Sequence, residues 1–195
     1  MKKLLIVIVL TTLVLFGATL GVSGIAEKNL QVAHLNDLKT LLPGSENFTV
    51  EPYDGEDANI RSVHKGETGF VVETVTYGYA GEITMFIGVS NEGKVTGLVV
   101  RELYETYGLG ANALTDVDFL SQFLNGSGEF AVATSGEDAF SGATGTVEES
   151  TGEATDVDAL TGATVTSKAI VRAVNSAISY VTGADISSAA TSWGG

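Results

Sequence analysis

The chain has 195 residues, a formal net charge of −14 and no cysteine. The absence of thiols excludes disulfides, thiolate metal sites and cysteine-held iron–sulfur clusters, so a redox function would need a bound organic cofactor. The negative charge argues against a nucleic acid partner, because binding to phosphates needs a basic surface.

The first 25 residues are predicted to be a membrane anchor. Two lysines precede an apolar run from Leu4 to Ile25 that contains no charge, and about 20 apolar residues can cross ~30 Å of lipid hydrocarbon. The lysines favour a cytoplasmic N-terminus. Residues 26–195 would then form one extracytoplasmic domain on a single-pass anchor in the cell membrane. A cleaved signal peptide is the alternative, since Gly24-Ile25-Ala26 offers small residues.

The first half of this domain is predicted to change from helix to sheet. Residues 26–42 show helical spacing of leucines and end at a Pro-Gly stop. Residues 45–66 are predicted to be irregular and polar, and the acids among them form a solvated turn rather than a calcium loop. An antiparallel meander follows, because β-branched and aromatic residues alternate between turn signals. Its predicted strands are residues 70–76, 83–89 and 95–101.

The second half contains two predicted helices separated by a weakly structured segment. A short helix is expected over 113–124, and a longer one over 168–181. Between them, residues 126–157 are acidic and rich in Gly, Ser and Thr, which predicts a poorly packed insertion. The fold class is therefore α+β, a twisted antiparallel sheet with packed helices, preceded by one N-terminal transmembrane helix.

Hydroxyl side chains cluster where the last helix begins. Thr164, Thr166 and Ser167 are each suited to be its N-cap. A helix N-terminus with free backbone N–H groups and a positive dipole end is a natural phosphate site. The pattern therefore favours an anion at this turn.

The same turn carries a seven-residue motif. Asp158-x-x-Thr161-Gly162-Ala163-Thr164 resembles the flavinylation motif Asp-x-x-(Ser/Thr)-Gly-Ala-Thr, which an FAD-dependent flavin transferase reads. The resemblance implies that Thr164 carries FMN through a phosphoester bond and that the transferase recognises Asp158. It also implies that the cofactor lies near Thr161, Gly162, Ala163, Thr166 and Lys168.

The motif occurs twice. Residues 138–146 repeat residues 158–166, with Asp, Ala, Gly, Ala, Thr and Thr at the same offsets, so Thr144 corresponds to Thr164. No amphipathic helix follows Thr144. Attachment is therefore predicted at Thr164, and modification of both threonines is the alternative.

The meander resembles a known FMN-binding domain. Its order is Gly-Phe-Val-Val, Gly-Tyr-Ala-Gly and Asn-Glu-Gly-Lys-Val-Thr-Gly, followed by Glu-Thr-Tyr-Gly-Leu-Gly at 105–110. This order is similar to the G subunit of Rnf-type ferredoxin:NAD oxidoreductases, whose domain the C subunit of sodium-pumping NADH:quinone reductases shares. The family has proline where this chain has Tyr107. The resemblance places five loop residues beside the flavin, namely Glu105, Thr106, Gly108, Leu109 and Gly110.

By this resemblance the function is electron transfer through covalent FMN in a membrane ferredoxin:NAD oxidoreductase that moves Na⁺ or H⁺. Its partners would be other membrane and iron–sulfur or flavin subunits, the flavin transferase during maturation, and membrane lipid through the anchor. No catalytic residue or metal ligand is predicted, and His34 and His64 are given no role. The alternatives are the flavin-carrying domain of another extracytoplasmic reductase and a membrane-tethered binding or surface protein without flavin.

Overall fold

The computed structural model describes residues 33–133 and 154–184. The predicted anchor over 1–25 and the motif copy with Thr144 lie outside these residues. Within the described ranges, none of the helices combines the length and the apolar character needed to cross a membrane. The single-pass anchor therefore stays a prediction.

The chain divides into two units after Leu38. The described part of the first unit, residues 33–38, is helical, and the helix continues to residue 41 in the second unit. This agrees with the end of the helix predicted over 26–42. The rest of the described chain belongs to the second unit, which begins at Lys39.

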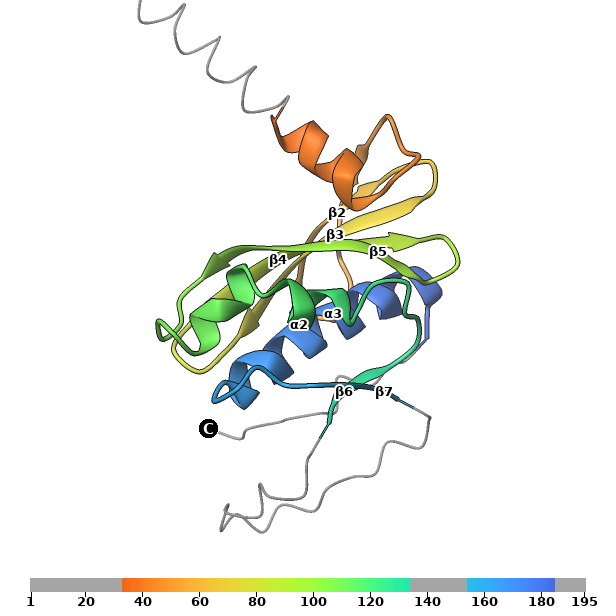
Figure 1. Cartoon of the computed structure of the whole chain (residues 1–195). Helices are drawn as coiled ribbons and strands as arrows, with labels where there is room; N and C mark the ends of the chain where they lie inside the picture. Colours follow the sequence, from red (N-terminus) through yellow and green to blue (C-terminus); the bar gives the residue numbers. More distant parts are fainter. Residues whose placement is uncertain (1–32, 134–153, 185–195) are drawn as a thin grey trace, which may run out of the picture. The chain divides into compact units, whose positions relative to one another are not determined.

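A five-stranded antiparallel sheet forms the first layer of the second unit, and its strands are ordered as in the sequence (Figure 1). The predicted meander is confirmed as the last three of these strands. The five strands are β1 (Thr49–Glu51), β2 (Ile60–Lys65), β3 (Gly69–Tyr77), β4 (Glu82–Ser90) and β5 (Val95–Leu103).

The prediction that residues 45–66 are irregular was wrong, because β1 and β2 lie there. In β2 only Ile60 and Val63 join the hydrophobic core. They are three residues apart, and a regular strand would point them to opposite faces. A register shift between Ile60 and Ser62 brings both to the core face, opposite Thr74 and Val72 of β3. Because of this bulge, the apolar residues of β2 do not alternate with period two, and the sequence pattern did not predict the strand.

The long C-terminal helix α3 (Thr164–Thr182) is the centre of the second unit. In Figure 1 it lies between the sheet and a small ribbon made of β6 (Phe130–Val132) and β7 (Thr155–Val157). Eleven of its 19 residues are buried. A helix enclosed in this way buries far more than one stripe, which explains why its buried residues include Thr166, Ser167, Asn175 and Ser176 as well as apolar ones.

The predicted insertion over 126–157 is better packed at both ends than expected. β6 and β7 pair in parallel, with Phe130 opposite Thr155 and Val132 opposite Val157. Phe130 and Val157 are buried in the main core, and Phe130 packs 5.3 Å from Phe123, centroid to centroid. Each of these strands has only three residues, so their apolar side chains gave no recognisable pattern among the surrounding Gly, Ser and Thr.

A side-chain amide fastens this ribbon to α3. Asn175 is buried; its Oδ1 accepts a hydrogen bond from the Phe130 N–H at 3.0 Å, and its Nδ2 donates to the Phe130 carbonyl at 2.9 Å. The amide therefore pairs with both backbone groups of Phe130, as a neighbouring strand would. Without it, two buried backbone groups would have to find other partners.

The helix predicted over 113–124 is two short helices, η1 (Gly110–Leu114) and α2 (Val117–Ser121). The break falls at Thr115 and Asp116. Asp116 is the N-cap of α2, and its carboxylate accepts a hydrogen bond from the Phe119 N–H at 2.9 Å. An aspartate that caps a new helix in this way ends the preceding one, and Phe119 then packs edge-on to Phe123.

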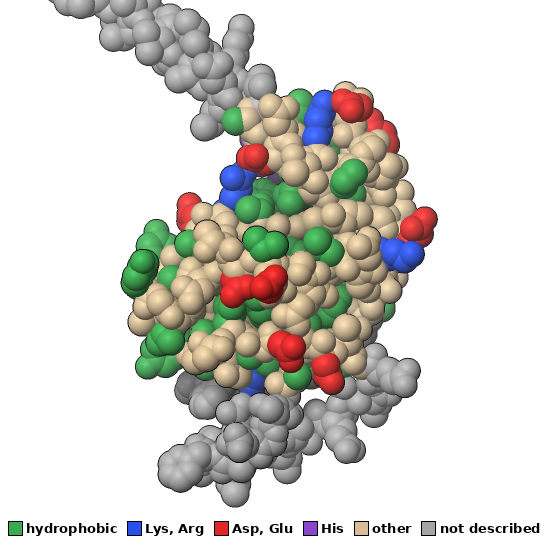
Figure 2. All heavy atoms as spheres, viewed as in Figure 1, with side chains coloured by type: hydrophobic (Ala, Val, Ile, Leu, Met, Phe, Trp, Pro, Cys, Tyr) green, Lys and Arg blue, Asp and Glu red, His purple; other side chains and the backbone are tan. Residues whose placement is uncertain are grey.

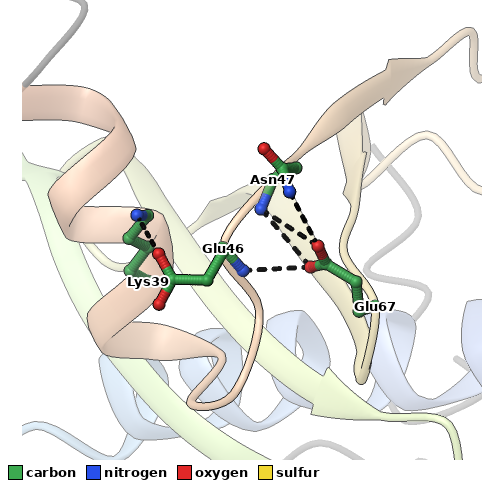
Figure 3. Close-up of polar contacts among 4 residues, drawn as sticks. All are labelled: Lys39, Glu46, Asn47 and Glu67. Atoms are coloured by element: carbon green, nitrogen blue, oxygen red, sulfur yellow. Dashed lines mark hydrogen bonds and ion pairs between the residues drawn. The ribbon is translucent and has the colours of Figure 1, made fainter.

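The connection from the first helix to β1 is held by a carboxylate (Figure 3). Glu67, in the β2–β3 turn, accepts hydrogen bonds from the Asn47 side chain at 3.0 Å and from the Glu46 N–H at 3.0 Å. Lys39 forms an ion pair with Glu46 on the same connection. These bonds, led by that from the Asn47 side chain, lower the pKa of Glu67 from its ordinary value of 4.5.

The Asn175 contact predicts a large loss of stability. Asn175→Ala leaves the buried N–H and carbonyl of Phe130 without their partners, so urea unfolding should show a loss of about 2–4 kcal/mol. Lys168→Ala, on the exposed side of the same helix, should stay within about 0.5 kcal/mol of wild type. Equal losses in the two variants would contradict the role of the amide.

The lowered pKa of Glu67 predicts a pH-dependent contribution. The folded carboxylate resists protonation, so its stabilisation is fully present above the ordinary pKa of 4.5 and is lost as the pH falls through the lower folded value. Glu67→Gln should therefore lower the urea midpoint at pH 7, and the difference from wild type should shrink below about pH 4. Glu92→Gln, on the exposed β4–β5 turn, is the control. A difference for Glu67→Gln that persists at low pH would be the contrary result.

Candidate functional site

A pocket of about 600 Å³ opens at the amino end of α3, within the range of about 300–1,000 Å³ that is common for ligand sites. Three segments form it: the β3–β4 turn, the loop after β5 and the start of α3. Its lining residues are Tyr79, Glu105, Thr106, Leu109, Gly110, Gly162, Ala163, Thr164, Val165 and Thr166.

Glu105 ties two of these segments together. Its carboxylate accepts hydrogen bonds from the backbone N–H groups of Tyr79 at 2.6 Å and Ala80 at 3.3 Å. The turn can approach so closely because Gly78 has no side chain, since a Cβ there would lie 1.9 Å from the Glu105 carboxylate. Glu105 therefore acts as the link between the β3–β4 turn and the loop after β5.

The same turn is also held by α3. Arg172 donates a hydrogen bond to the Tyr77 carbonyl at 2.8 Å, and its partial burial lowers the pKa of its guanidinium. Tyr77 itself donates its hydroxyl hydrogen to Glu82 at 2.7 Å, and this bond raises the pKa of the phenol. The wall of the pocket that carries Tyr79 is thus fixed at both ends.

The loop after β5 closes without the proline that the similar family carries. The Thr106 carbonyl accepts hydrogen bonds from the N–H groups of Leu109 at 3.2 Å and Ala111 at 3.1 Å, and Gly108 adopts a positive φ of 78°. The substituted residue, Tyr107, is 97% exposed. The turn therefore depends on the glycine and on the backbone bonds.

Gly110 brings this loop against the helix. A Cβ at this position would lie 2.6 Å from the Thr166 hydroxyl and 3.1 Å from the Glu105 carboxylate. Because real Cβ atoms do not approach so closely, only glycine lets the loop, the carboxylate and the first turn of α3 meet here. Gly110, Thr166 and Glu105 all line the pocket.

The amino end of α3 has no side-chain cap. The N-cap residue is Ala163, and it makes no side-chain cap bond. The predicted N-caps Thr164, Thr166 and Ser167 were therefore wrong, because the helix begins at Thr164, four residues before the predicted 168–181. The first N–H groups of a helix lack intrahelical partners, and the residues of this first turn, from Thr164 to Thr166, line the pocket.

Ser167 has another role, which its sequence position did not reveal. Its buried hydroxyl accepts a hydrogen bond from the Leu160 N–H at 3.0 Å and donates to the Ala163 carbonyl at 3.0 Å. Gly162 completes the turn with a φ of 72°. The serine therefore closes the loop that precedes the helix and presents Thr164 at its end.

The structure brings most of the predicted site residues together around the pocket, namely Glu105, Thr106, Leu109, Gly110, Gly162, Ala163, Thr164 and Thr166. Gly108 and Lys168 are exposed and are not among the lining residues. Thr161 and Asp158 face a second, shallower hollow of about 400 Å³ together with Asp116, Asp118 and Gln122. Thr144 lies outside the described residues.

Two lining residues were not predicted. Tyr79 belongs to the Gly-Tyr-Ala-Gly turn, which carried the resemblance but received no site role, and Val165 lies between two predicted residues. Both are exposed, as is Leu109. In Figure 2 hydrophobic side chains are exposed at the left of the view, where Figure 1 places the loops around the pocket. In the part of the chain that the structure describes, no cluster of three or more acidic or histidine side chains is arranged to hold a metal ion.

Comparison with known families matches residues 78–179 to the FMN-binding domain. The match spans more than half of the chain, from the β3–β4 turn almost to the end of α3, and includes every residue that lines the pocket. The first three strands of the sheet, β1 to β3, lie before it.

Three relatives are named as the G subunit of an ion-translocating complex. That of the Na⁺-translocating ferredoxin:NAD⁺ oxidoreductase complex of Acetobacterium woodii is 35% identical over 56% of this chain and 47% of its own length. The G subunit of the proton-translocating ferredoxin:NAD⁺ oxidoreductase complex of Clostridium ljungdahlii is 34% identical over 58% of this chain and 53% of its own length. The G subunit of the ion-translocating oxidoreductase complex of Methanosarcina acetivorans is 32% identical over 74% of this chain and 72% of its own length. The resemblance predicted from the sequence is confirmed, although the chain spans only about half the length of the first two relatives.

The Glu105 contact predicts a local change. Glu105→Ala removes the acceptor of the Tyr79 and Ala80 N–H groups, so hydrogen exchange of these two amides should accelerate by about tenfold. Glu102→Ala is the control: Glu102 is an exposed residue of β5 near Glu105 in the sequence, and its loss should leave both exchange rates unchanged. An acceleration spread evenly over the sheet would instead indicate a global loss of stability.

Proposed function

This chain belongs to the FMN-binding domain family, and from that premise we propose that the pocket at the amino end of α3 holds FMN. The uncapped first turn of α3 supports this most directly. Its free N–H groups and positive dipole end suit a phosphate. Apolar groups on Leu109, Val165 and Tyr79 line the remainder of the pocket and suit a flat aromatic ring.

The attachment point would be Thr164. It is the first residue of α3, it is partly buried and it lines the pocket. In the proposed maturation step, the Thr164 oxygen forms a bond to the flavin phosphorus of FAD, the pyrophosphate bond breaks and AMP leaves. The hydroxyl proton passes to solvent. The product is a phosphoester whose remaining negative charge lies at the positive end of the helix.

The other residues would hold and orient the cofactor. Gly110 and Gly162 let the walls of the pocket pack closely together, since a Cβ at either one would meet Thr166 or Leu109 within 3.0 Å. Glu105 would fix the wall that carries Tyr79. Lys168 lies on the exposed side of the first turn, where a charge contact is worth only about 0–1 kcal/mol.

Bound FMN supplies the redox chemistry, and the chain supplies position and environment. We infer that the chain is an electron-transfer subunit of an ion-translocating ferredoxin:NAD oxidoreductase, because the relatives carry that name. One of them is named for Na⁺ and another for protons, so their similarity does not select the coupling ion. The proposal includes an anchor over residues 1–25, an extracytoplasmic domain over 26–195, and contacts with other subunits of the complex and with a flavin transferase.

The attachment prediction separates this function from its alternatives. The full chain, coexpressed with the flavin transferase, should show flavin fluorescence in its denatured band and the mass of one added FMN. Thr164→Ala should lose both signals, because alanine offers no oxygen for the ester, whereas Thr144→Ala should keep nearly all of them. FMN mapped only to Thr144 would contradict the assignment, and a wild-type chain without flavin would favour a binding or surface protein.

A further inference from the structure

The side chain of Gln122, directly after α2, holds the first residue of the loop that carries the flavinylation motif. Gln122 Oε1 accepts a hydrogen bond from the Asp158 N–H at 2.8 Å, and Gln122 Nε2 donates to the Asp158 carbonyl at 3.3 Å. The amide thus contacts both backbone groups of the motif's first residue, from a position 36 residues earlier in the chain.

This amide is itself fixed in orientation. Its second Nε2 hydrogen is donated to the Phe119 carbonyl at 3.4 Å, so the acceptor and both donors are used. A flipped amide would place two oxygens against each other at Asp158 and at Phe119. Phe119 is buried, and its N–H donates a hydrogen bond to the Asp116 carboxylate. The Gln122 side chain is therefore anchored to a residue of the hydrophobic core.

The motif loop is held at two points by side chains from outside the loop. At its far end, Leu160 is buried and Ser167 bonds both to the Leu160 N–H and to the Ala163 carbonyl. At its near end, Gln122 holds Asp158, whose side chain remains exposed. Thr161 and Gly162, which lie between Leu160 and Ala163, are exposed as well. Gln122 therefore fixes the backbone from which the Asp158 carboxylate extends.

We propose that Gln122 is a positioning residue for the transfer of FMN to Thr164. It holds the Asp158 backbone so that the transferase meets the carboxylate and the threonine hydroxyl in one fixed arrangement. This inference rests on the proposed function, in which the Thr164 oxygen bonds to the flavin phosphorus of FAD, AMP leaves and the hydroxyl proton passes to solvent. Gln122 makes no bond to the reacting atoms and does not line the FMN pocket.

The physical consequence is a change in the fraction of chains that present the motif correctly. A transferase that binds one loop conformation has an apparent affinity reduced by the fraction of molecules that adopt it. Loss of two hydrogen bonds to the backbone should reduce that fraction by about tenfold. Since the chemistry at Thr164 is untouched, the effect should fall on KM for the chain and not on kcat.

The test uses the full chain purified without flavin, FAD and the purified flavin transferase, and it measures initial rates of covalent flavin formation at several chain concentrations. Gln122→Ala should raise KM about tenfold and leave kcat within about twofold of wild type. Gln122→Glu keeps the side-chain length but sets a carboxylate oxygen against the Asp158 and Phe119 carbonyls, so its KM should rise at least as much as that of Gln122→Ala. It also remains informative if the alanine variant folds poorly.

Ser121→Ala is the matched control, since Ser121 is the last residue of α2 and its hydroxyl bonds only within that helix, to the Asp118 carbonyl at 3.1 Å. Its KM should equal that of wild type. Once loaded, the Gln122 variants should have the same visible flavin spectrum as wild type, because the pocket itself is unchanged.

The outcomes separate this inference from the proposed function. If wild type acquires no flavin, the proposed function fails and this inference fails with it. If wild type is loaded and the Gln122 variants show the same KM or a lower one, only the inference is overturned. A fall in kcat at constant KM would also overturn it, because it would place Gln122 in the chemical step.

Discussion

The enclosure of α3 between the sheet and the β6–β7 ribbon fixes where the amino end of the helix lies, and the candidate site depends on that position. Ala169, Ala173 and Ala177 are all fully buried, and their small size lets neighbouring layers approach the helix closely. Because so much of the helix is buried, it cannot slide or tilt without opening the core. The end at Thr164 is therefore held rigidly against the loop after β5, and an uncapped helix terminus becomes part of a pocket instead of a frayed end.

Local patterns in the sequence were enough to predict the meander and the motif turn, but contacts between distant residues decided the rest. In β3, β4 and β5, apolar and polar residues alternate or β-branched residues form continuous runs, and both patterns are typical of strands. β2 was missed because a bulge aligned Ile60 with Val63, and the start of α3 was misplaced because Ala163 gives no capping signal. The pocket could be anticipated only through resemblance, since Glu105 and Thr166 meet across Gly110, which no spacing rule connects.

Two side-chain amides take over where the regular hydrogen bonding of the sheet ends. Asn175 pairs with both backbone groups of Phe130, and Gln122 pairs with both backbone groups of Asp158. Phe130 begins β6, and Asp158 directly follows β7, so the two amides fasten the two strands that flank residues 134–153. An amide can do this because its acceptor oxygen and donor nitrogen are bonded to the same carbon, and together they match the N–H and C=O of one extended residue. Such pairing depends on tertiary position, and nothing in the sequence around either residue marks it.

Under the proposed function, the form of the pocket also explains why a covalent bond would be useful. Tyr79 is 77% exposed and Val165 is 47% exposed, so the rim cannot enclose a ring as a buried site would. An open site of this kind gives up much of the burial on which ligand affinity depends. A phosphoester at Thr164 would make retention independent of that affinity, and the non-covalent contacts would then only need to orient the ring. The exposed rim would leave one edge of the flavin accessible to a redox partner, so the openness that weakens reversible binding is what electron transfer between proteins requires.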